Sequence, residues 1–259
     1  MRRNYFLVVA IWAIMLDTRA PAEPIFVRHT QHPTHRFMVA RSGAGKIIAG
    51  CEFSQAVQGD EVTMHLTYKF QDGSLDDETT TYQQQGTLRL VRNRHIQKGP
   101  FFVKPVDFMV ETATGIATSR TEDRNSKIHV ESHHIDLPDD LANGFVGTVL
   151  LNAQQSTAPF RVGMLAPVAG GRLIRLLISP EGEQPFHTAG QTLQATVFRI
   201  HPELGGIVGV IASLIGLQPK DVMVWVLEGE EPEVVRIVGQ LGGYGPVVSS
   251  ELEGTTFAK

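Results

Sequence analysis

The sequence contains very little cysteine and no strong excess of charge. One Cys among 259 residues excludes an internal disulfide framework and a cysteine-based zinc cluster. The net charge of -4 gives no basic field to attract a phosphate backbone, so general nucleic-acid binding is disfavoured. No hydrophobic run approaches the roughly 20 residues that a membrane-spanning helix requires.

Motifs for nucleophiles and phosphates are also missing. The sequence has no G-x-S-x-G elbow, and residues 41–46 lack the earlier glycine and the final Ser or Thr of a phosphate-binding loop. Cys51 has no recognisable catalytic context, so we expect it to be a small buried hydrophobe. The sequence therefore does not specify an activity, and we expect neither a cofactor nor a resident metal.

The first residues have the three-part layout of a secretory signal peptide. Arg2 and Arg3 precede an apolar run over residues 5–16, and Ala20-Pro21-Ala22 supplies an A-x-A cleavage pattern. We predict a signal peptide over 1–22, an N-terminal extension over 23–45 and a single β-barrel-like domain over 46–259. The mature protein is then expected to be soluble and periplasmic or secreted, by either the general secretory or the twin-arginine route.

Strict alternation of apolar and polar residues over 61–71 predicts a half-buried strand. An Asp-Gly turn follows at Asp72-Gly73, and a second β-rich run opens at Thr79 and ends near Val91, which predicts a hairpin. Further strands are predicted at Pro105–Glu111, Ile116–Thr121, Lys127–Asp136, Phe160–Ala166, Arg172–Ser179, Thr192–Ile200, Val222–Leu227, Val234–Val238 and Pro246–Leu252. Their separation by Gly, Pro, Asp and Asn is typical of an antiparallel sheet or barrel.

Two short helices are predicted within this all-β sequence. The first spans about Pro138–Asn152, because acids cluster at its start and apolar residues then repeat every four positions. The second spans about Leu204–Leu217 and is apolar nearly all round, so it must be buried. We expect an antiparallel barrel or half-barrel in which this helix is either part of the core or a lid over the opening.

Several polar clusters have both a structural and a functional interpretation. His29, His32 and His35 favour a polar terminus over a metal site, because Pro33 prevents a shared helical face. The strand pair His129 and His133 favours a solvated sheet face.

Two runs of charged residues also have both a structural and a functional interpretation. The acids Asp72, Asp76, Asp77 and Glu78 favour a charged hairpin turn over a calcium site. The basic run Arg92, Arg94, His95 and Lys98 precedes Phe101 and favours a solvated strand end, with an anion or lipid head group as the alternative contact.

Three segments stand out as a set: residues 68–80 (YKFQDGSLDDETT), 95–100 (HIQKGP) and 136–144 (DLPDDLANG). Together they resemble a family of exported bacterial β-rich proteins of unknown function. The resemblance implies a similar fold and compartment but no reaction. The layout is more distantly similar to the half-barrels that carry lipoproteins or lipids across the periplasm.

We therefore expect an exported barrel-like protein that binds or carries an apolar or amphipathic ligand, with transient membrane contact possible and oligomeric state open. The candidate ligand-binding residues are Ile207, Val210, Ile211, Leu214, His95, Lys98 and Phe101. One alternative is an envelope scaffold with no small-molecule site. Another is a metal-assisted or acid/base hydrolase, which requires His95, His133 and Asp76 to converge in one cleft.

Overall fold

The computed structural model describes residues 24–122, 127–167, 170–204, 219–241 and 245–257, which form antiparallel strands and one short helix. The first eight strands are β1 Thr34–Ser42, β2 Ile47–Gln58, β3 Glu61–Phe70, β4 Leu75–Gln83, β5 Arg89–Lys98, β6 Val106–Glu111, β7 Ile116–Glu122 and β8 Ile128–His134. After helix α1 Val146–Leu151 come β9 Phe160–Ala166, β10 Arg172–Thr188, β11 Gln191–Glu203, β12 Val222–Leu227, β13 Glu233–Gln240, β14 Val247–Leu252 and β15 Thr255–Phe257.

All of these strands belong to one antiparallel sheet. Its order is β15-β10-β11-β12-β13-β14-β1-β2-β3-β4-β5-β6-β7-β8, with β9 paired to β10 off this path. The meander β1–β8 is joined to the C-terminal strands through the pairing of β1 with β14. Among the described strands, β8 at one end of this order has no pairing with β9 or β15 at the other, so the sheet is an open half-barrel.

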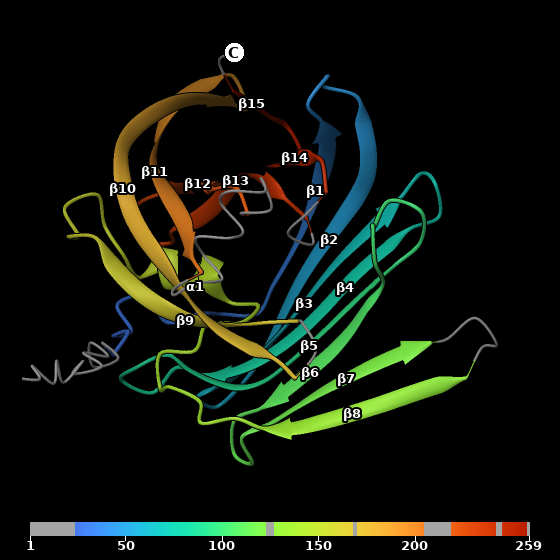
Figure 1. Ribbon diagram of the computed structural model, residues 1–259. Coiled ribbons are helices and arrows are strands. Elements are labelled where there is room, and N and C mark those ends of the chain that lie inside the picture. The colour runs from blue at the N-terminus through green and yellow to red at the C-terminus, as the bar shows by residue number, and fades with distance from the viewer. Residues whose placement is uncertain (1–23, 123–126, 168–169, 205–218, 242–244, 258–259) are drawn as a thin grey trace, which may run out of the picture.

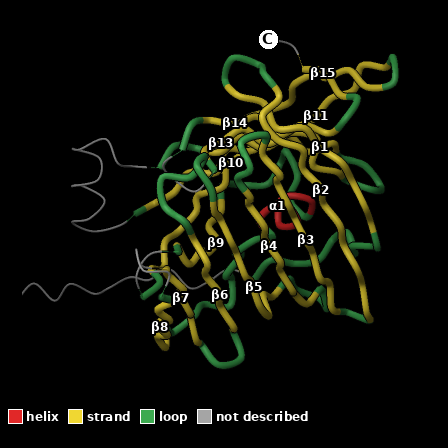
Figure 2. The backbone as a smooth tube through the Cα atoms, turned by 90° about the vertical axis from the view of Figure 1, so that its right-hand side faces the viewer, coloured by secondary structure: helices red, strands yellow, loops and turns green. Residues whose placement is uncertain are grey.

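The sheet curls around an interior that contains α1 (Figures 1 and 2). Residues Thr148, Val149 and Leu150 of the helix are buried, and the helix contacts β12 and β13. Phe145, directly before α1, stacks on Tyr82 of β4 with ring centroids 5.0 Å apart. The face of β4 that carries Tyr82 is therefore the inner face of the half-barrel.

Side-chain alternation along the strands divides the apolar residues into separate clusters. The main cluster fills the inside of the curve between β3–β6, α1 and β9–β12. A second cluster lies near one end of β1–β3 and includes Phe70 and Phe102. A third covers the opposite face of β12, where Trp225 packs near Phe186 and Phe257.

The structure confirms the predicted all-β half-barrel, and each of the nine further strand predictions corresponds to a strand from β6 to β14. The run predicted from Thr79 to Val91 is wrong in its bounds, because it contains parts of two strands, β4 and β5. Strands β1 and β2 were not predicted. Residues 34–42, which we assigned to an N-terminal extension, form β1 between β14 and β2.

The first helix is shorter than predicted. Only Val146–Leu151 is helical, because the preceding residues pair with β9 instead: the amide of Ala142 donates to Gly163 O, and Gly163 N donates to Asp140 O. Gly144 has a φ of 73°, which is outside the helical region. The predicted helix Leu204–Leu217 lies, apart from Leu204, outside the described residues. In the parts of the chain that the structure describes, no helix is both long enough and apolar enough to cross a membrane.

Candidate functional site

A stripe of polar side chains crosses the inner face of β4 and β5. It consists of three cross-strand pairs, Asp76 with Gln97, Glu78 with His95 and Thr80 with Asn93. These side chains share a face with Tyr82, because alternate residues of a strand point to the same side. We call these six residues the polar stripe and each cross-strand pair a rung.

Hydrogen bonds link the stripe along and between the strands. His95 Nε2 lies 2.7 Å from Asp76 Oδ1, and Gln97 Nε2 donates to Asp76 Oδ2 at 2.8 Å. Asn93 Nδ2 donates both to Glu78 Oε1 and to Thr80 Oγ1, each at 2.9 Å. The buried carboxylate of Asp76 and the buried amide nitrogens of Gln97 and Asn93 thus find hydrogen-bond partners within the stripe, as burial favours.

Apolar residues border the stripe on both sides. The residues directly opposite it on the neighbouring strands are Met64, Leu66 and Tyr68 of β3, and Val106, Phe108 and Val110 of β6. Leu66 faces Glu78, and Phe108 faces His95. The inner wall is therefore amphipathic across the strands, with a charged centre and apolar flanks.

The three rungs differ in burial. The outer rungs are closed: Asp76, Gln97, Thr80 and Asn93 are all at most 5% exposed. The middle rung is open, because Glu78 is half-buried and the His95 side chain is 21% exposed. The charged groups that can be reached from the interior are therefore those of Glu78 and His95.

The electrostatic environment keeps His95 protonated. Burial alone lowers the pKa of His95, but the nearby carboxylates of Glu78 and Asp76 outweigh burial and raise the pKa to about 9. At neutral pH the middle of the stripe then holds an imidazolium and two acidic side chains. Since one cation faces two carboxyl groups, the stripe has an excess of negative charge.

Two tight turns close the ends of the stripe. A Cβ on Gly144 would lie 1.9 Å from Thr80 Oγ1 and 2.5 Å from Asn93 Nδ2, so the backbone before α1 packs directly on one end rung. At the other end, a Cβ on Gly99 would lie 2.6 Å from Cα of Ser74, the residue before β4. Only glycine allows both this approach and the positive φ that the two turns adopt.

Three segments that lie far apart in the sequence meet at this stripe. Residues 68–80 supply Asp76, Glu78 and Thr80, residues 95–100 supply His95 and Gln97, and residues 136–144 supply the Gly144 contact. They build one part of the inner wall. Because this part combines buried hydrogen-bonded polar groups with two accessible charged groups, the polar stripe is the candidate site.

The predicted ligand-binding residues separate into different environments. His95 belongs to the stripe, whereas Lys98 is exposed on the outer face of β5, because three positions along a strand reverse the side. Phe101 lies near the Gly99 turn, stacked on Phe70 with ring centroids 4.3 Å apart. Ile207, Val210, Ile211 and Leu214 lie outside the described residues.

The predicted charged runs were interpreted wrongly. Of the acids assigned to a turn, only Asp72 lies in it, while Asp76, Asp77 and Glu78 lie in β4. The basic run is divided by the sheet: His95 points inward, whereas Arg94 points outward and pairs with Asp107 at 3.2 Å. His35 is not in a frayed terminus, because it lies in β1 and bonds Glu52 at 2.8 Å.

The three residues of the hydrolase hypothesis do not all meet. His95 and Asp76 are bonded, but His133 is exposed on β8. Strand β8 is three strands from β5, or about 14 Å at the usual strand spacing. Cys51 offers no reactive thiol, because burial raises its pKa to about 12. The described residues contain no group of three or more His, Cys, Asp or Glu side chains placed to hold a metal ion.

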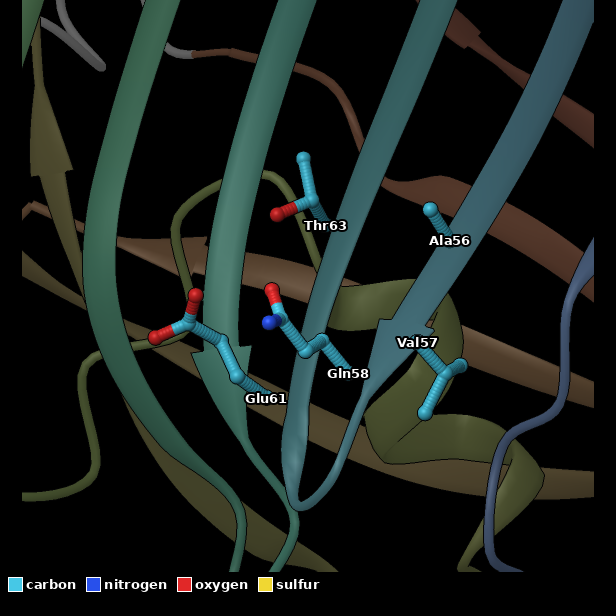
Figure 3. A pocket seen from close by; sticks show the side chains of 5 residues that line it. All are labelled: Ala56, Val57, Gln58, Glu61 and Thr63. Atoms are coloured by element: carbon cyan, nitrogen blue, oxygen red, sulfur yellow. The ribbon is translucent and has the colours of Figure 1, made fainter.

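A pocket of about 390 Å³ lies at the turn between β2 and β3 (Figure 3). It is lined by Ala56, Val57, Gln58, Glu61 and Thr63. The carboxylate of Glu61 already accepts a hydrogen bond from Gln83 Nε2 at 3.3 Å. Because no second charged group lines it, this pocket has less binding chemistry than the stripe.

Sequence reasoning named His95 and Asp76 but missed the rest of the stripe. The segment Asp76-Asp77-Glu78-Thr79-Thr80-Thr81 is polar on both faces of β4, so it has no apolar alternation to reveal a strand. A usable signal was the matching polar residues at alternate positions 93, 95 and 97 of the next strand. Together with the short connection, they indicate a shared polar face.

Comparison with known proteins gives a likeness of fold. No family model matches the chain, and no curated protein matches it. The crystal structure of a β-barrel-like protein of domain of unknown function DUF1849 from Brucella abortus is similar over 88% of this chain and 98% of that chain, with 9% sequence identity and a TM-score of 0.46.

Proposed function

We propose that this protein is an exported carrier or binding protein for an amphipathic ligand of the cell envelope. The observation that carries the proposal is the accessible Glu78–His95 rung, set in an inner wall that is otherwise largely apolar. A ligand with one polar and one apolar part can contact both surfaces at once. The signal-peptide pattern over residues 1–22 supports the export part of the proposal.

The flanking strands supply the apolar part of this site. Leu66 on β3 and Val106 on β6 are only partly buried, and both lie beside the stripe on the inner face. Covering such apolar surface stabilises a complex by about 25 cal/mol for each Å² removed from water. The polar rung then fixes the orientation of the ligand rather than supplying most of the affinity.

Native mass spectrometry of the protein purified from its own exported fraction tests the proposal. We expect an added mass that extracts into organic solvent, and saturable binding of dodecyl maltoside below its critical micelle concentration after extraction. A clean mass of the mature chain together with no binding of dodecyl maltoside would overturn the proposal.

A second candidate function is that of an envelope scaffold, which strand β8 favours. All seven residues of β8 are exposed, and the strand is at an edge of the sheet, where backbone groups are available for pairing. Ile128 and Val130 are 55% and 57% exposed on this edge. Sedimentation of the extracted protein distinguishes this role, since a scaffold without a ligand site would associate through β8 and bind no amphiphile.

A further inference from the structure

We propose that the inner wall selects amphiphiles with a cationic head group, such as an alkylammonium, and that this group binds against the Glu78 carboxylate. The inference rests on the proposed function and adds to it the chemical class of the ligand. Of the two carboxylates of the stripe, only one is bonded to a charged group of the protein.

The carboxylate of Asp76 is fully engaged. Its Oδ1 bonds His95 at 2.7 Å, and its Oδ2 accepts from Gln97 at 2.8 Å. With both oxygens bonded and its side chain only 8% exposed, Asp76 is shielded from a ligand. The single positive charge of His95 offsets only part of the combined negative charge of Asp76 and Glu78.

Glu78 interacts with the charge of His95 through space, but it is Asp76 that bonds the imidazole. Glu78 Oε1 accepts one hydrogen bond from the neutral amide of Asn93, and no Lys, Arg or His of the described residues forms an ion pair with Glu78. The Cα of Glu78 is opposite His95, yet the imidazole is bonded to Asp76 instead. The second carboxylate oxygen of Glu78 therefore remains available in the open rung, and the excess negative charge is centred there.

The surroundings determine how a ligand can approach. The Gly144 turn lies on the rung next to Glu78, where a Cβ would be 3.0 Å from Glu78 Oε1, so access from that end is blocked. Leu66 lies opposite Glu78 on β3 and provides an apolar surface for an alkyl chain. A head group at Glu78 and a chain along β3 would thus fit one amphiphile.

Electrostatics then ranks the possible head groups. A cation adds the direct ion pair that Glu78 does not form with any described residue, in a site partly removed from water, where charge interactions are stronger than in bulk solvent. A neutral head group gains no such pairing. An anionic head group would be repelled by Glu78, because two like charges would then be buried together.

Three amphiphiles with the same alkyl chain test this order: dodecyltrimethylammonium, dodecyl maltoside and dodecyl sulfate. Their affinities for the extracted full-length mature protein are measured by calorimetry at neutral pH, below each critical micelle concentration. We expect the cationic amphiphile to bind about tenfold or more tightly than the neutral one, the size expected for one charge-assisted contact, and the anionic one to bind most weakly.

Two variants of opposite sign locate the effect. Glu78→Gln should remove the preference for the cation, whereas His95→Gln, which removes the positive charge of the rung, should increase it. Glu111→Gln is the control, because it makes the same change in net charge on the outer face, where Glu111 lies near Arg92. Thermal unfolding of each variant confirms that it is folded.

Each outcome bears on one of the two proposals. Equal binding of all three amphiphiles by the unmodified protein would overturn the cationic class and leave the proposed function standing. A preference that survives Glu78→Gln, or that is lost equally in Glu111→Gln, would also overturn it. If none of the three binds, the proposed function itself fails.

Discussion

Asp76 and Asp77 are adjacent in β4, but their carboxylates bond histidines on opposite faces of the sheet. Asp76 reaches His95 at 2.7 Å on the inner face, and Asp77 reaches His65 at 2.8 Å on the outer face. The inner pair is largely buried, whereas the His65 side chain is 49% exposed. These two neighbouring aspartates therefore form a buried ion pair and an exposed one, and the contributions of the two pairs to stability can be compared within one strand.

Asp76→Asn should destabilise the fold strongly. The change leaves the buried imidazole and the Gln97 amide without their anionic acceptor, and breaking a buried pair in this way costs about 3 kcal/mol or more. Asp77→Asn is the matched control and should cost less than about 1 kcal/mol, as for other surface pairs. Chemical denaturation with urea measures both, and equal effects would contradict the assigned burial.

The protonation of His95 should make stability depend on pH on the alkaline side. Because the pKa of His95 is about 9 in the folded protein and 6.5 in its ordinary state, the folded form binds the proton more tightly. This stabilisation is complete below pH 6.5 and is lost as the pH rises to about 9. We expect a loss of about 2 kcal/mol in the free energy of unfolding over this window.

Nuclear magnetic resonance titration of the His95 ring measures its pKa directly, and Asp76→Asn should lower that value. Unfolding of His95→Gln at several pH values gives a second measure, because this variant should lack most of the slope between pH 6.5 and 9. A His95 ring that titrates at or below 6.5 would show that the carboxylates do not dominate its environment.

Gly144→Ala should be among the most damaging single-methyl additions in the chain. The new Cβ would overlap Thr80 Oγ1 and Asn93 Nδ2, and a φ of 73° adds backbone strain of about 1–2 kcal/mol. Gly86→Ala is the control, because it has a similar φ of 69° and nothing within 4 Å of the added carbon. The difference in melting temperature between the two variants isolates the contact with the stripe.

The ion pair between Arg175 and Asp140 should be essential for placing the segment that carries Gly144. Asp140 is only 2% exposed in its side chain and bonds Arg175 Nη1 at 2.6 Å. Arg175→Met leaves a buried carboxylate unpaired and should cost about 3–5 kcal/mol. Arg161→Met removes an exposed partner of Glu203 and should have little effect on urea denaturation.

We predict that residues 1–22 are cleaved from the amino terminus when the protein is exported. The A-x-A pattern ends at Ala22, so the exported protein should begin at Glu23. Amino-terminal sequencing of the protein from the periplasmic or extracellular fraction measures the cleavage point. A chain recovered from the cytoplasm with Met1 in place would contradict export.

Sequence periodicity predicted the architecture well where one face of a strand is apolar. Strand β3 alternates Val62, Met64 and Leu66 with polar residues and was located almost to the residue. Strand β1 was missed, because its polar first half and its Arg41 interrupt the alternation. Propensity also overestimated the first helix, since pairing of residues 140–142 with β9 outweighs it.

The candidate site could be predicted only in fragments. His95 and Asp76 were considered together as one group, but their bond depends on the register between β4 and β5, which includes an irregularity after Thr81. A shift of one residue would turn every side chain of the stripe to the other face. The contact of Gly144 depends on a fold of the chain across some fifty residues, for which local sequence has no signal.

The pairing of β1 with β14 has a consequence for when the protein can fold. Met38 and Leu252 are directly opposite each other, although more than two hundred residues separate them along the chain. The centre of the sheet therefore cannot form until nearly the whole polypeptide has been synthesised, and contacts of such long range make folding slow. Until then the consecutive strands from β2 to β8 can pair with one another, but the two halves of the sheet stay unjoined.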